Sequence, residues 1–350
     1  MATAFPLLRL PYLVLMPVLE QMKFLDRSVK TCMISASITI GLSLLSKRAR
    51  IFVKLLKMNC KHIDLILTGN RIVMEVFFDN SEELRVLMYT DKCQRINFIY
   101  RDMMSISWFP GSPLPIDYAF SIMDVMHCKS IDKFIIVKIS EHDCLPIIAK
   151  LPKIDEVVVE HDWPDVISYE EYFQTEKQLL RVLRTVLPVS SAVFITYQFQ
   201  NSNHLQEILK GNLDAVILKH SDNYITLNDL SITNAKILEI HTGKLDERDL
   251  NHYFKLWMKK ICNDRLEYLE VRTYGKISMD LLLDGLNAVP VRIDTKKTFR
   301  VLGNVKRFVP EDLFEKMTRE FDITRVDKRT ATIKISNYGN IFFLRLARIY

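Results

Sequence analysis

The feature that most constrains this chain is a series of short, strand-like apolar segments, each followed by a helical stretch. The segments are Phe134–Ile139, Glu156–His161, Ala192–Phe199, Ala215–His220, Lys236–His241 and Leu266–Val271. Their centres lie about 22 to 37 residues apart, and a period of about 20–29 residues is typical of leucine-rich-repeat-like solenoids. Alternating strands and helices predict an α/β fold with a parallel sheet. We favour a solenoid over a doubly wound domain because the connections are short and glycine is scarce.

The stretches between these segments carry helix signals. Tyr169–Leu187 has apolar residues at helical spacing and ends before Pro188, which cannot continue a helix. In Asp246–Cys262 the first residue is placed to cap the N-terminus. Ser202–Lys210 stops at Gly211, a residue type that favours C-terminal caps. Each stretch therefore predicts a helix that covers the sheet.

After Asn287 the repeat fades into alternating segments. These are FDITRVD, RTATIKISN and IFFLRLARI, and little more than Lys328 separates the first two. Alternation with a period of two predicts antiparallel strands. A terminal repeat must hide its exposed apolar face, so we expect these strands to form a C-terminal β cap.

Ahead of the repeats, residues 62–115 predict a small β-rich connecting region. HIDLILT and RIVMEVFF flank Gly69-Asn70, a pair that allows the positive φ of a tight hairpin turn. The stretch Trp108–Pro115 holds three prolines and a glycine and breaks regular structure. We place a boundary there, with the solenoid domain over 116–350.

The basic excess of the chain belongs to residues 1–61. This segment holds ten Lys/Arg and two acids, a net of +8, whereas the whole chain has a net of +6. It predicts a separate helical module with an acidic partner, or a solvated basic helix face. A nucleic-acid-binding role for the basic run 47–61 is the weaker alternative, because this run lacks the interleaved aromatic residues of single-strand binders.

Several chemistries are excluded by what the sequence lacks. The nine glycines are too far apart for any glycine-rich nucleotide motif, and no histidine begins H-E-x-x-H. His127/Cys128 and His142/Cys144 are the tightest His/Cys pairs, and we interpret them as core or surface residues. No cofactor, no metal and no catalytic residue is expected.

Cysteine usage and hydropathy predict the cellular location of the protein. Six cysteines without a C-x-x-C pair are typical of reduced thiols in a cytoplasmic or nuclear protein. Leu10–Leu19 is interrupted by prolines and has no cleavage site, so it is not expected to be a signal peptide. The run Cys32–Leu45 is shorter than the roughly 20 residues that cross a bilayer, and no membrane contact is expected.

Three collinear motifs resemble one family. FPLLRLPYLVLMPVLEQM, followed by LSLLSKRARIFVKLLK, resembles the F-box of nematode-type F-box proteins. Ile225–Val271 resembles the type-2 F-box-associated domain of the same family, and Phe321–Ile333 is similar to its C-terminal signature.

The resemblance implies a substrate-recognition adaptor of a cullin-RING (SCF-type) ubiquitin ligase, which is not itself an enzyme. Its F-box would bind a Skp-family linker, and through it cullin. The linker-binding side chains would be Leu10, Pro11, Leu13, Leu15, Val18 and Met22. The downstream domain would hold a protein substrate, which the sequence does not identify.

Strand alternation adds candidate substrate-binding residues. If the solenoid presents one exposed strand face, that face carries Lys138, Glu160, Tyr197, Lys219, Glu239 and Glu270. A register shift of one residue would exchange this face with the core.

Two departures from the family pattern leave a second interpretation open. Pro17 lies where the family has a polar residue inside the first F-box helix, and it would remove a backbone hydrogen bond there at a cost of about 3 kcal/mol or a kink. Ser28–Gly41 is an insertion relative to the family. The alternative is therefore a protein-interaction scaffold whose F-box has decayed.

Overall fold

The computed structural model of the 350-residue chain describes residues 40, 43, 47–55, 58, 60–69, 71–79, 83–89, 96–100, 104–108, 115–139, 145–160, 169–219, 225–242, 244–273, 277–291, 317–336 and 340–345. The chain divides into two compact units, Met1–Ile154 and Asp155–Tyr350. Among the described residues, no helix combines the length and the apolar composition needed to cross a membrane.

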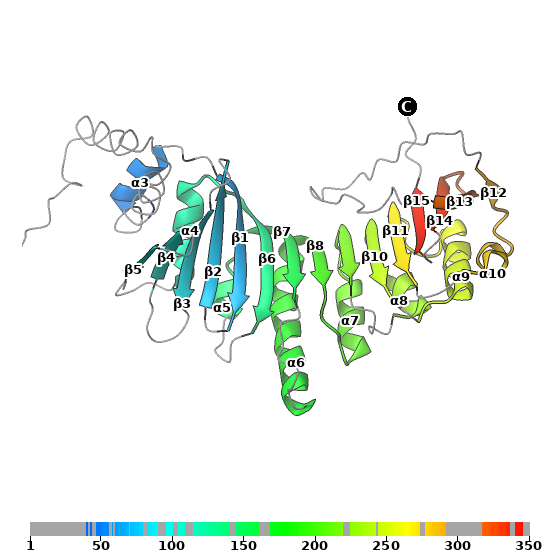
Figure 1. Ribbon diagram of the computed structural model, residues 1–350, viewed down its shortest axis with the longest axis horizontal. Helices are drawn as coiled ribbons and strands as arrows, with labels where there is room; N and C mark the ends of the chain where they lie inside the picture. Colours follow the sequence, from blue (N-terminus) through cyan, green and yellow to red (C-terminus); the bar gives the residue numbers. More distant parts are fainter. Residues whose placement is uncertain are drawn as a thin grey trace, which may run out of the picture. The chain divides into compact units, whose positions relative to one another are not determined.

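The first unit is a sheet with short helices (Figure 1). Its strands lie in the order β6-β1-β2-β3-β4-β5. Their bounds are β1 Cys60–Thr68, β2 Arg71–Phe78, β3 Glu83–Tyr89, β4 Ile96–Tyr100, β5 Met104–Trp108 and β6 Ser130–Lys138. The helices of this unit are α3 Lys47–Leu55, α4 Pro115–Val125 and α5 Leu145–Ile148.

The predicted hairpin is confirmed. β1 and β2 pair antiparallel from Thr68↔Arg71 outward, and Gly69 has a φ of 58°. A residue without a Cβ adopts that conformation most readily, so Gly69 favours this turn and, with it, the register of both strands.

The predicted boundary near residue 115 differs from the structure. β6, which the sequence assigned to the downstream domain, pairs in parallel with β1, with Asp64 opposite Lys133. The pairing places both strands in the first unit, which ends at Ile154. Pairing between strands so far apart leaves no local signal in the sequence.

The basic run of the N-terminal segment contributes one described helix. α3 contains Val53, which is buried, and Lys54, whose Nζ lies 2.6 Å from the Asp124 carboxylate of α4. The His127 ring also contacts the backbone oxygen of Lys54, at 3.2 Å. The end of the predicted 1–61 module thus packs within the first unit, and residues 1–39 lie outside the described residues.

The second unit alternates strands and helices, as the sequence predicts. Four strands, β8 Ser190–Ile195, β9 Ala215–Leu218, β10 Ile237–His241 and β11 Tyr268–Arg272, pair in parallel and in chain order. β7 (Lys153–Val159), which begins just ahead of the division, lies beside β8. The mixed α/β class is confirmed.

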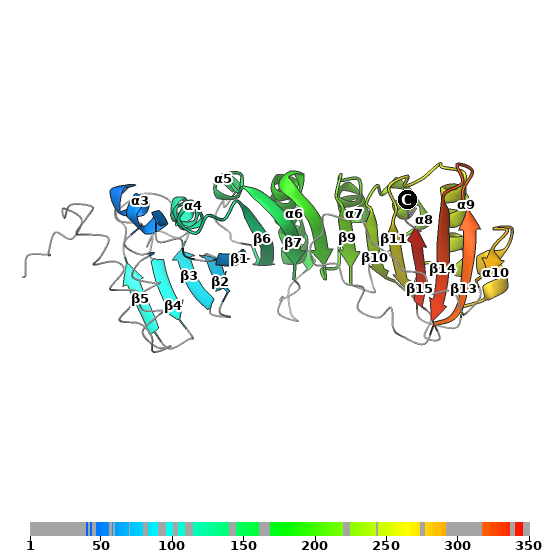
Figure 2. The same ribbon diagram turned by 90° about the horizontal axis from the view of Figure 1, so that it is seen from above.

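Helices cover one face of this sheet (Figure 2). They are α6 Tyr169–Val186, α7 Ser202–Leu209, α8 Leu227–Ile232 and α9 Glu247–Met258, with the 3-10 turn η2 Leu187–Val189 after α6 and the short α10 Met279–Leu283 beyond β11. Gly211 directly follows Lys210, the C-cap residue of α7, as the sequence predicts. An added Cβ there would meet the Ile208 backbone oxygen at 2.9 Å, so a close approach explains this glycine.

The C-terminal strands form the expected antiparallel group. β13 (Met317–Thr324), β14 (Thr330–Ser336) and β15 (Asn340–Arg345) pair in succession, and the two-residue β12 (Val289–Pro290) pairs with β13. β15 also pairs antiparallel with β11, with Leu269 opposite Phe343. These strands thus cover the edge that β11 would otherwise expose, and an open strand edge is a site of aggregation.

Aromatic side chains of α9 join the helix layer to these strands. The Phe343 ring stacks on Phe254, with centroids 5.6 Å apart, and meets Trp257 edge-on at 4.8 Å. The buried Arg325 guanidinium lies 5.2 Å from the Trp257 ring and pairs with Asp264 and Asp327. These contacts fix the turn between β13 and β14 to the end of α9.

We expect the N-cap of α9 to contribute measurably to stability. Asp246 Oδ1 accepts a hydrogen bond from the Asp249 backbone N–H at 2.8 Å, within a reciprocal capping box. Asp246→Ala should lower the free energy of unfolding by about 1 kcal/mol, and Asp246→Asn, which keeps a capping oxygen, by less. Urea denaturation followed by circular dichroism measures both, and equal stability of Asp246→Ala and wild type would contradict the assignment.

Candidate protein-interaction surface

The sheet of the second unit has two faces with different partners. Phe343 packs against α9, and its partner Leu269 lies on that same side of β11. Because side chains alternate along a strand, Tyr268 and Glu270 point to the opposite face. That opposite face holds the candidate surface.

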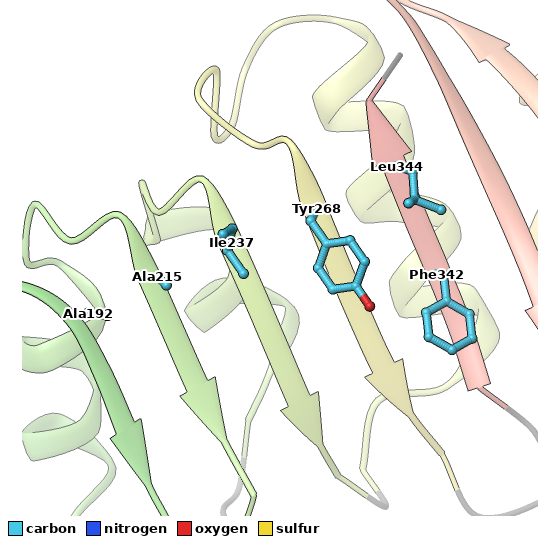
Figure 3. Packing of buried hydrophobic residues seen from close by; sticks show 6 residues of the cluster. All are labelled: Ala192, Ala215, Ile237, Tyr268, Phe342 and Leu344. Atoms are coloured by element: carbon cyan, nitrogen blue, oxygen red, sulfur yellow. The ribbon is translucent and has the colours of Figure 1, made fainter. Parts of the chain in front are cut away.

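Aligned register builds rows across the opposite face. The first row runs through buried residues on neighbouring strands and is shown in Figure 3: Ala192, Ala215, Ile237, Tyr268 and Leu344, with Phe342 two residues from Leu344 on β15. The small residues lie on β8 and β9, and the large ones on β11 and β15. This row forms an apolar floor beside the polar residues.

Polar residues gather next to this floor. We call them the charged cluster: Lys219, Glu239, His241, Tyr268, Glu270 and Arg272. Glu239 and Glu270 are direct partners on β10 and β11, and so are His241 and Arg272. The cluster thus spans the ends of three consecutive parallel strands.

Glu239 is the centre of the cluster. Its Oε1 lies 3.2 Å from His241 Nε2, 3.6 Å from Lys219 Nζ and 3.9 Å from an Arg272 nitrogen. Burial by itself would raise the pKa of Glu239, but the hydrogen bond from His241 and the charge of Lys219 outweigh it, so the pKa is lowered. The carboxylate is therefore held in its charged form.

Glu270 is held from both sides. Arg272 Nε donates to its Oε1 at 2.7 Å, and the Tyr268 hydroxyl donates to its Oε2 at 2.7 Å. Burial, together with the neighbouring Glu270 charge, raises the pKa of Tyr268 well above its usual range, so the hydroxyl keeps its proton and acts as a donor. Such charge-assisted bonds fix the side chains firmly.

The cations of the cluster retain partial exposure. The side chains of Lys219 and Arg272 are 25% and 29% exposed, whereas that of Glu239 is 10% exposed. Lys219 also lies over the Phe194 ring, at 5.3 Å. The surface therefore offers positioned N–H donors above buried carboxylates, an arrangement suited to binding a polar or acidic partner.

The six predicted substrate-binding residues do not all lie together in the structure. The fold brings Lys219, Glu239 and Glu270 together in the charged cluster. Lys138 and Glu160 are exposed, as expected. They lie at the ends of β6 and β7, which precede the strands of the cluster in the sequence. Their role in binding stays a prediction.

The expected exposure is wrong for three of the six. Tyr197 is 1% exposed and meets Phe199 edge-on at 5.1 Å, because it alternates with the buried Val193 and Ile195 and lies one residue out of the predicted register. Glu239 and Glu270 are also buried, because neighbouring cations and Tyr268 pack over their carboxylates. The six predicted linker-binding residues, Leu10, Pro11, Leu13, Leu15, Val18 and Met22, lie outside the described residues.

Three members of the cluster were not predicted from the sequence: His241, Tyr268 and Arg272. Each lies two residues from a predicted glutamate in the same strand, so each shares that glutamate's face. A period-two search for charged and hydrogen-bonding residues around Glu239 and Glu270 would have found all three.

Glu239→Gln should change the pH dependence of stability. The folded-state pKa of Glu239 is lowered, so its contribution is present above the unfolded value of about 4.3 and is lost as pH falls through the folded value. We expect the variant to melt below wild type at about pH 7 and the gap to shrink below about pH 4. Thermal denaturation across this range tests it, with the exposed Glu160→Gln as control; a gap that does not change with pH contradicts it.

Comparison with known proteins bears on this surface. A family model described as "F-box associated" matches residues 204–271, which include most of α7, all of β9, α8, β10 and α9, and nearly all of β11. No curated protein and no solved structure shows a significant match to the chain. The matched region contains every member of the charged cluster except Arg272, which follows it directly. Part of the second unit is therefore similar to F-box-associated domains.

Proposed function

We propose that this chain is the substrate-recognition adaptor of a cullin-RING (SCF-type) ubiquitin ligase. Residues 1–61 bind a Skp-family linker, and through it cullin, as an F-box of nematode type. The second unit binds a protein substrate with the charged cluster. The chain acts without catalytic residues of its own, in the cytoplasm or the nucleus, where such ligases work.

The observation that carries this proposal is the coincidence of the family match with the charged cluster. The match covers residues 204–271, and the cluster lies on the strands of that same region. Domains found next to an F-box are expected to hold the protein that the ligase modifies. The match thus supports substrate binding at the place where the second unit offers fixed polar groups.

The repeated strand–helix units suit this role. β8 to β11 pair in chain order, and each strand presents its side chains in line with the next. We interpret this stack as a leucine-rich-repeat-like solenoid, in which each repeat contacts mainly its neighbours and one continuous face binds a partner. A rigid face limits the entropy lost on binding.

Linker binding should depend on the apolar residues of the predicted F-box. Leu13→Asp with Leu15→Asp, in the full chain, places charges in the proposed apolar anchor and should abolish co-purification with the Skp-family linker. Other proteins held by the second unit should remain bound. Affinity purification with mass spectrometry measures both, and linker capture that survives the double variant would refute this part of the proposal.

Substrate capture should show the reverse pattern. Lys219→Met with Arg272→Met removes two partly exposed cations from the charged cluster and keeps most of their apolar stems. We expect loss of the bound substrate with the linker retained. Lys244→Met with Lys260→Met changes exposed lysines of the same unit outside the cluster and serves as the control; equal losses in both variants would contradict a role for the cluster.

The scaffold alternative predicts a different result. If Pro17 and Ser28–Gly41 have inactivated the F-box, the wild-type chain does not retain the linker, and Pro17→Glu with removal of Ser28–Gly41 restores binding. The nucleic-acid alternative predicts binding that weakens steeply with salt. One cation of the 47–61 run, Lys54, is already paired with Asp124.

A further inference from the structure

Three side chains with metal-ligand chemistry meet in the first unit. His62 and Asp64 lie on β1, and Asp132 lies on β6. One ligand atom from each residue, an imidazole nitrogen or a carboxylate oxygen, lies within 4.8 Å of the other two. No metal was expected because Asp132 is far from His62 and Asp64 in the sequence; the β1–β6 pairing brings it close.

The fold holds these side chains in place. The β1 register shifts between Cys60 and His62, and such irregularities re-aim side chains. The His62 ring stacks on Phe77, with centroids 4.3 Å apart and planes at 20°, which fixes the ring orientation. Asp64 Oδ1 accepts a hydrogen bond from the Lys133 backbone N–H at 3.1 Å. The ligand atoms are thus oriented by β2 and β6 neighbours, as metal ligands usually are by surrounding groups.

Burial strengthens the electrostatic repulsion between the two aspartates. Asp64 is 6% exposed, and Asp132 is half-buried beside it. Two carboxylates so close together in a partly desolvated site repel each other when both are ionised. A divalent cation removes this repulsion, and a neutral imidazole beside two carboxylates completes a ligand set typical of zinc and related transition metals.

We propose that His62, Asp64 and Asp132 bind a divalent transition-metal ion of the zinc class. The three side chains supply three ligands, and water supplies the remaining one of a tetrahedral set. The ion cross-links β1 to β6 and so stabilises the parallel pair on which the first unit is built. The metal ligands lie outside both the predicted linker-binding residues and the charged cluster, so the proposal does not depend on linker or substrate binding.

Zinc titration of the full-length chain tests the proposal. After removal of bound metals with a chelator, isothermal titration calorimetry should show one equivalent of Zn²⁺ bound, with a rise in the melting temperature. His62→Gln and Asp132→Asn should each weaken binding at least tenfold and remove the thermal shift. The exposed His252→Gln and Asp280→Asn carry the same chemical changes in the second unit and should bind as wild type does.

A second measurement keeps the test decisive if a variant fails to fold. Co²⁺ bound to the wild-type chain should give the weak visible bands of nitrogen and oxygen ligands. A strong thiolate charge-transfer band would place the metal on cysteines such as Cys60 or Cys128 and would overturn the proposal. So would the absence of zinc binding, or unchanged binding by folded His62→Gln.

Discussion

The in-register parallel pairing of β8, β9, β10 and β11 is the constraint on which the rest of the second unit depends. Each strand places its residues directly opposite those of the next. Residues at equivalent positions in successive strands therefore form rows across the sheet. The apolar row packs from Ala192 to Leu344, and the charged side chains lie two and four residues further along the strands. A slip of one residue in any strand would turn its side chains to the opposite face of the sheet.

The C-terminal strands complete this arrangement. β15 pairs with β11, and Phe343 reaches the rings of Phe254 and Trp257 on α9. Arg325 then joins the β13–β14 turn to the same helix through Trp257, Asp264 and Asp327. A segment that follows the family-matched region by some fifty residues thus supports the strand that carries Tyr268 and Glu270. The matched region and the C-terminal strands form one structural unit in consequence.

Local signals in the sequence predicted much of the fold and less of the site. The hairpin at Gly69, the helix capped by Asp246 and the antiparallel C-terminal strands follow from turn, capping and alternation patterns, and all three are present. The pairing of β1 with β6 and the meeting of Asp132 with His62 depend on segments far apart, which no local pattern encodes. Tyr197 was misassigned because it has the parity of the buried Val193 and Ile195, so the predicted register was off by one residue there.

The account assigns two partners to two parts of one chain, and cross-linking mass spectrometry on complexes purified with the full-length protein tests that division most directly. We predict that the Skp-family linker cross-links to lysines of the first 61 residues, such as Lys23 and Lys30, and that a different protein cross-links to Lys219 in the charged cluster. A linker that cross-links to Lys219, or a single partner that cross-links to both places, would contradict the account.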